Sequence, residues 1–359
     1  MKQTAIHMNH LQLNAKMGEF RGWDVPLLFS SINEEYHAVR YAAGLFDIGF
    51  LGRIEIAGTG SAAFLQQVFS RDVSRQAEGS ALYGLLCTDA GAILADAILL
   101  RLTGGRYLLT ISAGTTEKVL SWLGKLEGKS VILTDHAEKT AHFALQGPSS
   151  AAVIEKLAAP HFKKLRTRQV KELPAEGGVV VISRTGYTGE DGYEFILPAA
   201  SAPSFWDLLL QTGKDAGVLP CGNDVRDILR LEMGYLLYGN DIDETRSPWE
   251  AGLSSVVDVK KDFIGRDALI KLKAAGTRES IVGFALSERA VPRLGGSIFS
   301  ENHEIGTVTS CALSPAMRGG IGLGYVQSRY AQPGQEVDIE AKDREFAAKI
   351  VEVPFYRKK

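Results

Sequence analysis

The chain has 359 residues, of which 45% are apolar, and this is typical of a globular protein built from two or three packed domains. Forty Lys and Arg against 42 Asp and Glu give a formal net charge of −2, which offers no support for binding to nucleic acid or to an anionic membrane surface. Three widely spaced cysteines without a CxxC pair indicate a reducing compartment. The start lacks a signal-peptide pattern, and no segment approaches the ~20 apolar residues of a membrane span. We therefore expect a cytoplasmic protein without a membrane anchor.

Helical periodicity and short apolar runs alternate along the first three quarters of the chain. The periodicity predicts helices over residues 33–46, 61–69, 115–126, 149–159, 201–216, 224–236 and 266–275. The apolar runs predict strands over residues 92–102, 106–112, 131–134, 140–146, 179–184 and 193–197. Because hairpins rather than helices link several of these strands, we expect an α+β fold with mostly antiparallel sheets.

The pattern changes near residue 276. Short strands follow at regular spacing, over residues 280–286, 304–311, 321–326, 336–339 and 347–353. They predict a small C-terminal β-barrel or sandwich. The sequence thus predicts an N-terminal region over residues 1–275 and a C-terminal domain over residues 276–359.

One carboxylate, Asp96, interrupts the apolar strand expected over residues 92–102. With a two-residue period it shares a face with Leu94, Ile98 and Leu100, where an unpaired charge is costly. Two interpretations follow: a structural partner such as an arginine, or a place in the wall of a cavity that tunes its proton affinity.

A glycine-rich segment over residues 184–194 lies between two predicted strands. Its GxxGxxG order is not the dinucleotide fingerprint, because a strand follows it rather than a helix. It predicts a tight hairpin, either an ordinary exposed turn or a ligand-binding one. In the second case Tyr187 can stack on a flat ring, and Glu194 can accept two parallel N–H bonds from a heterocycle edge.

A charged helix over residues 224–236 carries Arg226 and Arg230 at i, i+4 spacing. Two interpretations of these arginines are open. They form salt bridges to Asp227 and Glu232 on the helix surface, or they bind a substrate carboxylate. The scattered histidines form no ligand pattern with Cys, Asp or Glu, so we expect no metal site. Nucleophile-elbow and Walker A motifs are absent from the sequence.

Taken together, these segments resemble the aminomethyltransferase (T-protein) family of the glycine cleavage system, from Asn14 to the C-terminus. The hairpin is the most specific match. The matching stretches are residues 22–27 (GWDVPL), 37–40 (HAVR), 44–47 (GLFD), 146–148 (QGP), 184–194, 226–227 with 229–232, 237–239 (LYG), 291–293 (VPR), 309–310 with 314–315, and 354–356 (PFY).

The resemblance implies a three-domain cloverleaf around a central folate pocket, with two interleaved subdomains in the N-terminal region and a C-terminal barrel. It implies Asp96 as the catalytic residue, with Ala95 in place of a preceding aspartate. It also implies tetrahydrofolate as the cofactor, contacted by Glu194, Arg226, Tyr187 and Tyr83. The implied reaction moves a methylene from an aminomethyl group on the lipoyl arm of H-protein to tetrahydrofolate and releases ammonia.

The sequence departs from the family pattern at several positions near the expected site. The usual DVSHM becomes DIGFL at residues 47–51, which removes a histidine, and a common asparagine becomes Ser112. A usual GLGA becomes GNDV at residues 222–225, and an asparagine becomes Arg71. Two alternatives are a folate-dependent demethylase acting on a small N-, O- or S-methyl compound, and a non-catalytic folate-binding assembly factor. The sequence TGYT at residues 185–188 and the retained Asp96 argue against the second.

Overall fold

The computed structural model describes residues 1–126, 128, 130–158, 165–175, 177–341 and 344–358, which form two compact units. The first unit contains residues 1–84 and 96–226, and the second contains residues 85–95 and those from 227 onward. The boundary predicted near residue 276 lies within the second unit, between helix α8 (Arg266–Ala275) and strand β15 (Glu279–Leu286). That boundary stays a prediction.

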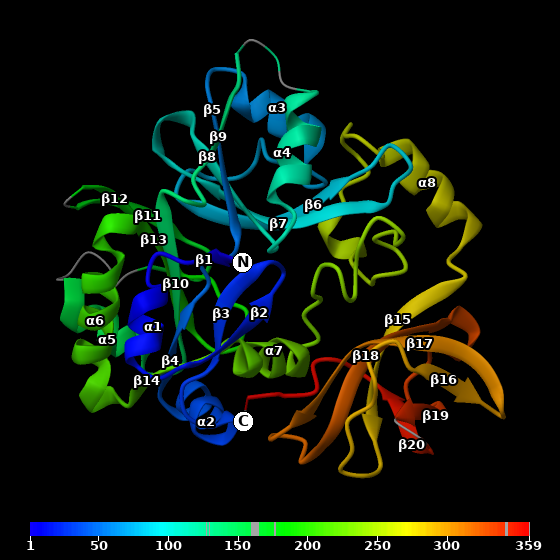
Figure 1. Ribbon diagram of the computed structural model, residues 1–359. Coiled ribbons are helices and arrows are strands. Elements are labelled where there is room, and N and C mark those ends of the chain that lie inside the picture. Colours follow the sequence, from blue (N-terminus) through cyan, green and yellow to red (C-terminus); the bar gives the residue numbers. More distant parts are fainter. Residues whose placement is uncertain (127, 129, 159–164, 176, 342–343, 359) are drawn as a thin grey trace. The chain divides into compact units, whose positions relative to one another are not determined.

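Two large sheets and a small one run through the first unit (Figure 1). The six-stranded sheet has the order β11 (Val170–Ala175), β12 (Gly178–Ser183), β13 (Gly192–Pro198), β10 (Thr140–Gln146), β4 (Ala43–Asp47), β14 (Val218–Pro220). The five-stranded sheet has the order β6 (Ser80–Cys87), β7 (Ile93–Arg101), β8 (Tyr107–Ile111), β5 (Gly52–Ala57), β9 (Ile132–Asp135). The small sheet has the order β1 (Lys2–Gln3), β3 (Trp23–Leu28), β2 (Lys16–Phe20). Pairing is mostly antiparallel, with parallel contacts at β1–β3 and β4–β14.

Short helices accompany these sheets. They are α1 (His7–Gln12), α2 (Ile32–Tyr41), α3 (Ser61–Val68), α4 (Thr116–Gly124), α5 (Ser150–Ala158), α6 (Ala202–Gly213) and α7 (Asn223–Glu232), the last of which continues into the second unit. Helix α2 begins at a typical N-cap, because the Ser31 hydroxyl accepts a bond from the backbone N–H of Glu34.

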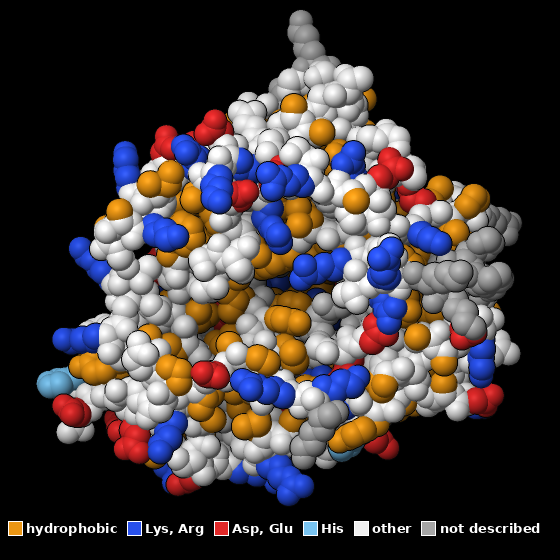
Figure 2. Space-filling view, turned by 180° about the vertical axis from the view of Figure 1, so that it is seen from behind, with side chains coloured by type: hydrophobic (Ala, Val, Ile, Leu, Met, Phe, Trp, Pro, Cys, Tyr) orange, Lys and Arg blue, Asp and Glu red, His pale blue; other side chains and the backbone are white. Residues whose placement is uncertain are grey.

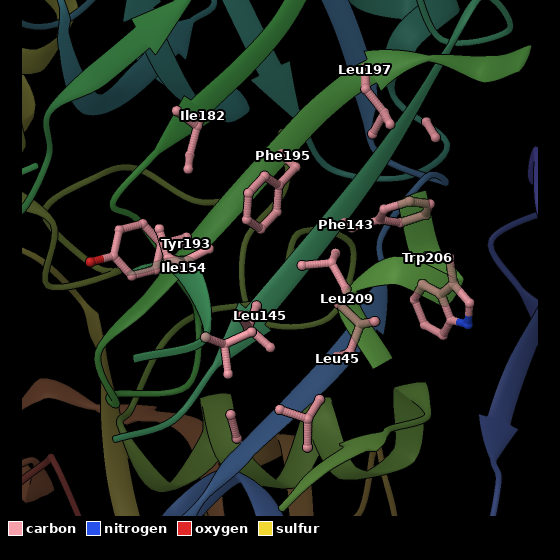
Figure 3. Packing of buried hydrophobic residues seen from close by; sticks show 14 of the residues in the cluster. Leu45, Phe143, Leu145, Ile154, Ile182, Tyr193, Phe195, Leu197, Trp206 and Leu209 are labelled. Atoms are coloured by element: carbon pink, nitrogen blue, oxygen red, sulfur yellow. The ribbon is translucent and has the colours of Figure 1, made fainter. Parts of the chain in front are cut away.

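The six-stranded sheet buries apolar side chains on one face and both apolar and polar side chains on the other. The apolar side chains of β10 pair across the sheet, Phe143 with Phe195 and Leu145 with Tyr193. They pack toward Trp206 of α6 in the core shown in Figure 3. Each fully buried side chain of this kind contributes roughly 1.5–3 kcal/mol. The two-residue period of a strand then directs the intervening polar side chains to the opposite face, where the candidate site lies.

The second unit contains a closed barrel of six strands (Figure 1). In spatial order they are β15, β18 (Gly319–Gln327), β17 (His303–Ser314), β16 (Ser297–Ser300), β19 (Glu336–Ala341) and β20 (Arg344–Val351). Closure leaves no exposed strand edge, and alternate side chains such as Phe284, Val326 and Ile350 fill the interior. The expected α+β fold with mostly antiparallel sheets and a C-terminal barrel is confirmed.

Two predicted helices end later than the observed ones, and several elements were not predicted. The helix expected to reach residue 46 ends at Tyr41, because the apolar residues that follow form the buried central strand β4. The helix expected to reach residue 236 ends at Glu232, where Gly234 adopts a left-handed conformation with φ 67°. The sequence analysis missed helix α1 and strands β1 to β6, β11, β14 and β16. The predicted helix end at Ala159 lies outside the described residues. On the face shown in Figure 2, basic and acidic side chains are interspersed, in keeping with the small net charge.

A buried ion pair connects α7 to the barrel within the second unit. The Arg230 guanidinium donates to Asp241 at 2.7 Å and to the Ser310 hydroxyl at 2.8 Å, and the side chains of the ion pair are almost fully buried. The Asp241 carboxylate also accepts from the hydroxyls of Thr309 and Ser310 at 2.6 and 2.7 Å. Four good contacts thus compensate the cost of placing two charges inside the protein.

Removal of this carboxylate is expected to destabilise the second unit strongly. The change Asp241→Ala leaves the Arg230 charge buried without its main partner, and we expect a loss of about 3–5 kcal/mol in the free energy of unfolding. Urea denaturation measures this loss. The change Asp89→Ala removes an exposed aspartate of the same unit and should have an effect within about 0.5 kcal/mol. A loss below about 1 kcal/mol for Asp241→Ala would contradict the assignment.

Candidate active site

Strand β7 carries Asp96, the carboxylate that the sequence singled out, and its side chain is half-buried. The hydroxyl of Tyr83 on β6 donates to one carboxylate oxygen, and the hydroxyl of Ser112, just after β8, donates to the other, both at 3.2 Å. Burial raises the pKa of Asp96 above its usual value, and the two hydroxyls oppose this only in part. The side-chain hydrogen-bond partners that the structure gives for Asp96 are therefore two neutral hydroxyls. These bonds do not show the pairing with an arginine that one of the two interpretations expects.

The phenol of Tyr83 is kept protonated by its surroundings. Burial is the main reason that the pKa of Tyr83 lies well above its ordinary value, and the nearby charge of Asp96 and the proximity of Tyr187 raise it further. The phenol therefore stays protonated and remains a donor to Asp96.

The hairpin between β12 and β13 has an eight-residue loop, so the expected tight turn is wrong although the antiparallel pairing is right. Side chains rather than a tight backbone turn give the loop its shape. At the base of the loop, the Arg184 guanidinium donates two parallel hydrogen bonds of 2.8 and 2.6 Å to the Asp191 carboxylate. The Gln146 side chain bonds to Thr185 and Thr188, and it leaves no room for a Cβ atom at position 186.

Arg226 contacts two aromatic rings in the first unit. Its guanidinium carbon is 4.7 Å from the centre of the Tyr187 ring and 5.6 Å from that of the buried Phe50. A guanidinium stacks on aromatic faces in this way, and it keeps its N–H edge directed outward from the stack. Tyr187 is thus held from one side by a cation.

Glu194 of β13 completes the group. Its carboxylate accepts from the Thr185 hydroxyl at 3.0 Å and lies 3.5 Å from the imidazole of the fully buried His142. Burial by itself raises the pKa of Glu194, but His142, Thr185 and Arg226 outweigh it and bring the pKa below the usual glutamate value. A charged acceptor with little exposure is therefore fixed between Thr185 and His142.

Comparison with known proteins identifies the family. Residues 6–261 match the family model described as the GCVT N-terminal domain, and residues 280–357 match the glycine cleavage T-protein C-terminal barrel domain. The chain belongs to the aminomethyltransferase family. The expected enzyme class, a one-carbon transferase, is thereby confirmed.

Relatives and a solved structure agree over nearly the whole chain. The aminomethyltransferase of Halothermothrix orenii is 39% identical over 99% of this chain and 100% of its own length. That of Geobacillus kaustophilus is 39% identical over 100% and 99%. The crystal structure of the glycine cleavage system aminomethyltransferase T from Bartonella henselae gives a TM-score of 0.93 at 31% identity and covers 99% of this chain and 98% of that one. Among the described residues, no helix combines the length and apolarity that a membrane crossing requires.

The departures from the aminomethyltransferase pattern have clear structural places. Ser112 replaces an amide yet still donates to Asp96. Phe50 replaces a histidine and packs against Phe20 and Arg226. Gly222, which the family pattern shares, is required by its surroundings, because a Cβ atom there would lie 2.0 Å from the carbonyl oxygen of Leu27.

The sequence assigns Tyr83, Tyr187, Glu194 and Arg226 to one site with Asp96, and all five lie in the first unit. Contacts pair Tyr83 with Asp96 and Arg226 with Tyr187, and the shared site stays a prediction. The sequence analysis did not single out His142. The signal was available, because a histidine inside the apolar run of residues 140–146 resembles the carboxylate inside the apolar run of β7. Arg230, the second arginine of α7, forms the buried pair with Asp241 instead, and it also bonds Asp227, one of its two predicted partners.

The raised pKa of Asp96 predicts that its charge destabilises the fold. The native protein holds a proton on Asp96 to a higher pH than the unfolded chain, so stability falls as the pH rises through the native pKa. The change Asp96→Asn removes this loss and should raise the Tm at neutral pH by about 1–3 °C. The advantage should disappear below about pH 4. Calorimetry across the pH range checks this, with exposed Asp215→Asn as the control. A lower Tm at neutral pH would contradict it.

Proposed function

We propose that the protein transfers a methylene unit from an aminomethyl group, carried on the lipoyl arm of an H-protein, to tetrahydrofolate with release of ammonia. The observation that supports this best is a half-buried carboxylate, Asp96, held by two neutral hydroxyls in the same unit as Glu194 and the Arg226–Tyr187 pair. The aminomethyltransferase names of the relatives support the reaction class. These relatives do not favour a demethylase or an assembly factor.

The residues present fit a reduced folate. The pterin ring presents an N–H and an amino group side by side, and the ionised carboxylate of Glu194 can accept from both. The Tyr187 ring offers a flat surface that Arg226 already stabilises. The positive charge of Arg226 suits the carboxylates of the folate tail.

Asp96 is the proposed catalytic residue. Bound tetrahydrofolate supplies the nitrogen nucleophile that takes up the carbon unit. The Asp96 carboxylate is proposed to orient that amine and to stabilise the positive charge that develops on it, for which it need not be a strong base. The hydroxyls of Tyr83 and Ser112 fix both of its oxygens, so little reorganisation is required during the reaction.

The lipoylated H-protein is the proposed carbon donor, and the cytoplasm is the proposed location. The donor assignment is supported by the likeness to the Bartonella henselae protein, which is an aminomethyltransferase of the glycine cleavage system. A single-turnover reaction tests it. Aminomethyl-loaded H-protein should release ammonia and form methylenetetrahydrofolate only when tetrahydrofolate is present. If folate binds and neither product forms, the proposed donor is wrong.

Loss of the Asp96 charge should stop turnover and spare binding. The change Asp96→Asn keeps the size of the side chain, so we expect tetrahydrofolate affinity within about three-fold of wild type and a fall in the single-turnover rate of roughly 100-fold or more. Calorimetric titration and rapid quench measure the two quantities. The exposed Asp89→Asn serves as the control. An unchanged rate in Asp96→Asn would remove Asp96 from the catalytic role.

Loss of the Glu194 charge should have the opposite signature. The amide of Glu194→Gln cannot accept two N–H groups equally well, so the affinity for tetrahydrofolate should fall roughly ten-fold or more. The rate at saturating folate should change less. Exposed Glu78→Gln is the matched control, and equal affinity in Glu194→Gln and wild type would exclude Glu194 from the pterin contact.

A further inference from the structure

His142 is a fully buried histidine on the face of the six-stranded sheet that also carries Glu194. It lies on β10, and its Cα partner on β13 is Ile196, two residues from Glu194. Both residues therefore point to the same side of the sheet, diagonally across one strand pair. Within the described residues, neither ring nitrogen makes a hydrogen bond. Such a buried polar ring requires an explanation.

The nearest polar atom that the structure gives for this ring belongs to Glu194. The Nε2 atom lies 3.5 Å from Oε2, slightly too far for a good hydrogen bond, and a small rotation of either side chain would form one. Contacts of this kind are often long without ligand and shorten when ligand binds. The Thr185 hydroxyl donates a hydrogen bond to the same carboxylate oxygen, Oε2.

Charged side chains from three elements act on the His142 imidazole. Glu194 comes from β13, Arg53 from β5 and Arg226 from α7. Burial lowers the pKa of His142, and the two arginines lower it further against the opposing effect of Glu194. The imidazole is therefore neutral at physiological pH, with one N–H to donate.

We propose that His142 is a positioning residue for the folate site, whose Nε2–H group binds Glu194 Oε2 and turns Oε1 toward the ligand. The identity of the ligand as a folate rests on the proposed function. The contact between His142 and Glu194 does not depend on it. Two donors on Oε2, Thr185 and His142, fix the rotation of the carboxylate. Two donors also keep Glu194 ionised where burial opposes ionisation.

The first test needs no ligand. In protein labelled with ¹⁵N at the histidine rings, the His142 signals are assigned by their loss in His142→Gln. We expect the tautomer with hydrogen on Nε2, and a shift of these signals in Glu194→Gln. A hydrogen on Nδ1, or His142 signals that do not shift in Glu194→Gln, would overturn the proposal. This holds whether or not the protein binds folate.

The second test measures affinity for 5-formyltetrahydrofolate, a stable probe, as a function of pH. Without the His142 donor the pKa of Glu194 rises, so His142→Phe should bind roughly ten-fold more weakly and lose binding at a higher pH than wild type. The amide of His142→Gln can donate and should restore both. Exposed His303→Phe is the control.

The outcomes separate the two ideas. A uniform loss of affinity in His142→Phe, with an unmoved pH midpoint and no rescue by His142→Gln, indicates a packing role and overturns the inference. Absence of probe binding in wild type contradicts the proposed function, and the NMR result then decides the inference alone.

Discussion

The guanidinium of Arg53 is the constraint on which the arrangement of the first unit depends. It is completely buried, and burial lowers its pKa to about 10, so it remains charged at neutral pH. A buried charge without partners costs several kcal/mol. Arg53 meets this demand with bonds to the backbone carbonyls of Gly49, Leu51 and Ala137 and to Thr140. The segments that supply these acceptors cannot move independently.

Two parts of the candidate site follow from this anchoring. The bonds to Gly49 and Leu51 hold the carbonyls on either side of Phe50, and the Phe50 ring supports Arg226. The bonds to Thr140 fix the start of β10, the strand that carries His142 and Gln146. The buried Arg53 charge, which is not a proposed ligand contact, thus helps to position both the Phe50 ring that contacts Arg226 and the strand β10 beside Glu194.

The sequence predicted local structure best where one physical signal dominated. Helix α8 and strand β10 were predicted with their observed limits, and Asp96 stood out because a carboxylate in an apolar strand is costly. The resemblance assigned the remaining site residues. Contacts between distant segments were not predictable in this way. The bond from Ser112 to Asp96 and the approach of His142 to Glu194 depend on strand register, which no local pattern specifies.

The loop over residues 184–191 has a consequence for the thermodynamics of recognition. Its base is held by the pair of Arg184 and Asp191, and the buried Arg40 donates to the Thr188 carbonyl and to Glu190. Tyr187, between these contacts, is already ordered before any ligand arrives. Ordering a loop and its side chains on binding consumes part of the interaction free energy, typically 0.5–1.5 kcal/mol for each immobilised side chain. A flat ring that stacks on Tyr187 therefore meets a preorganised surface, and most of the free energy of stacking is available for affinity.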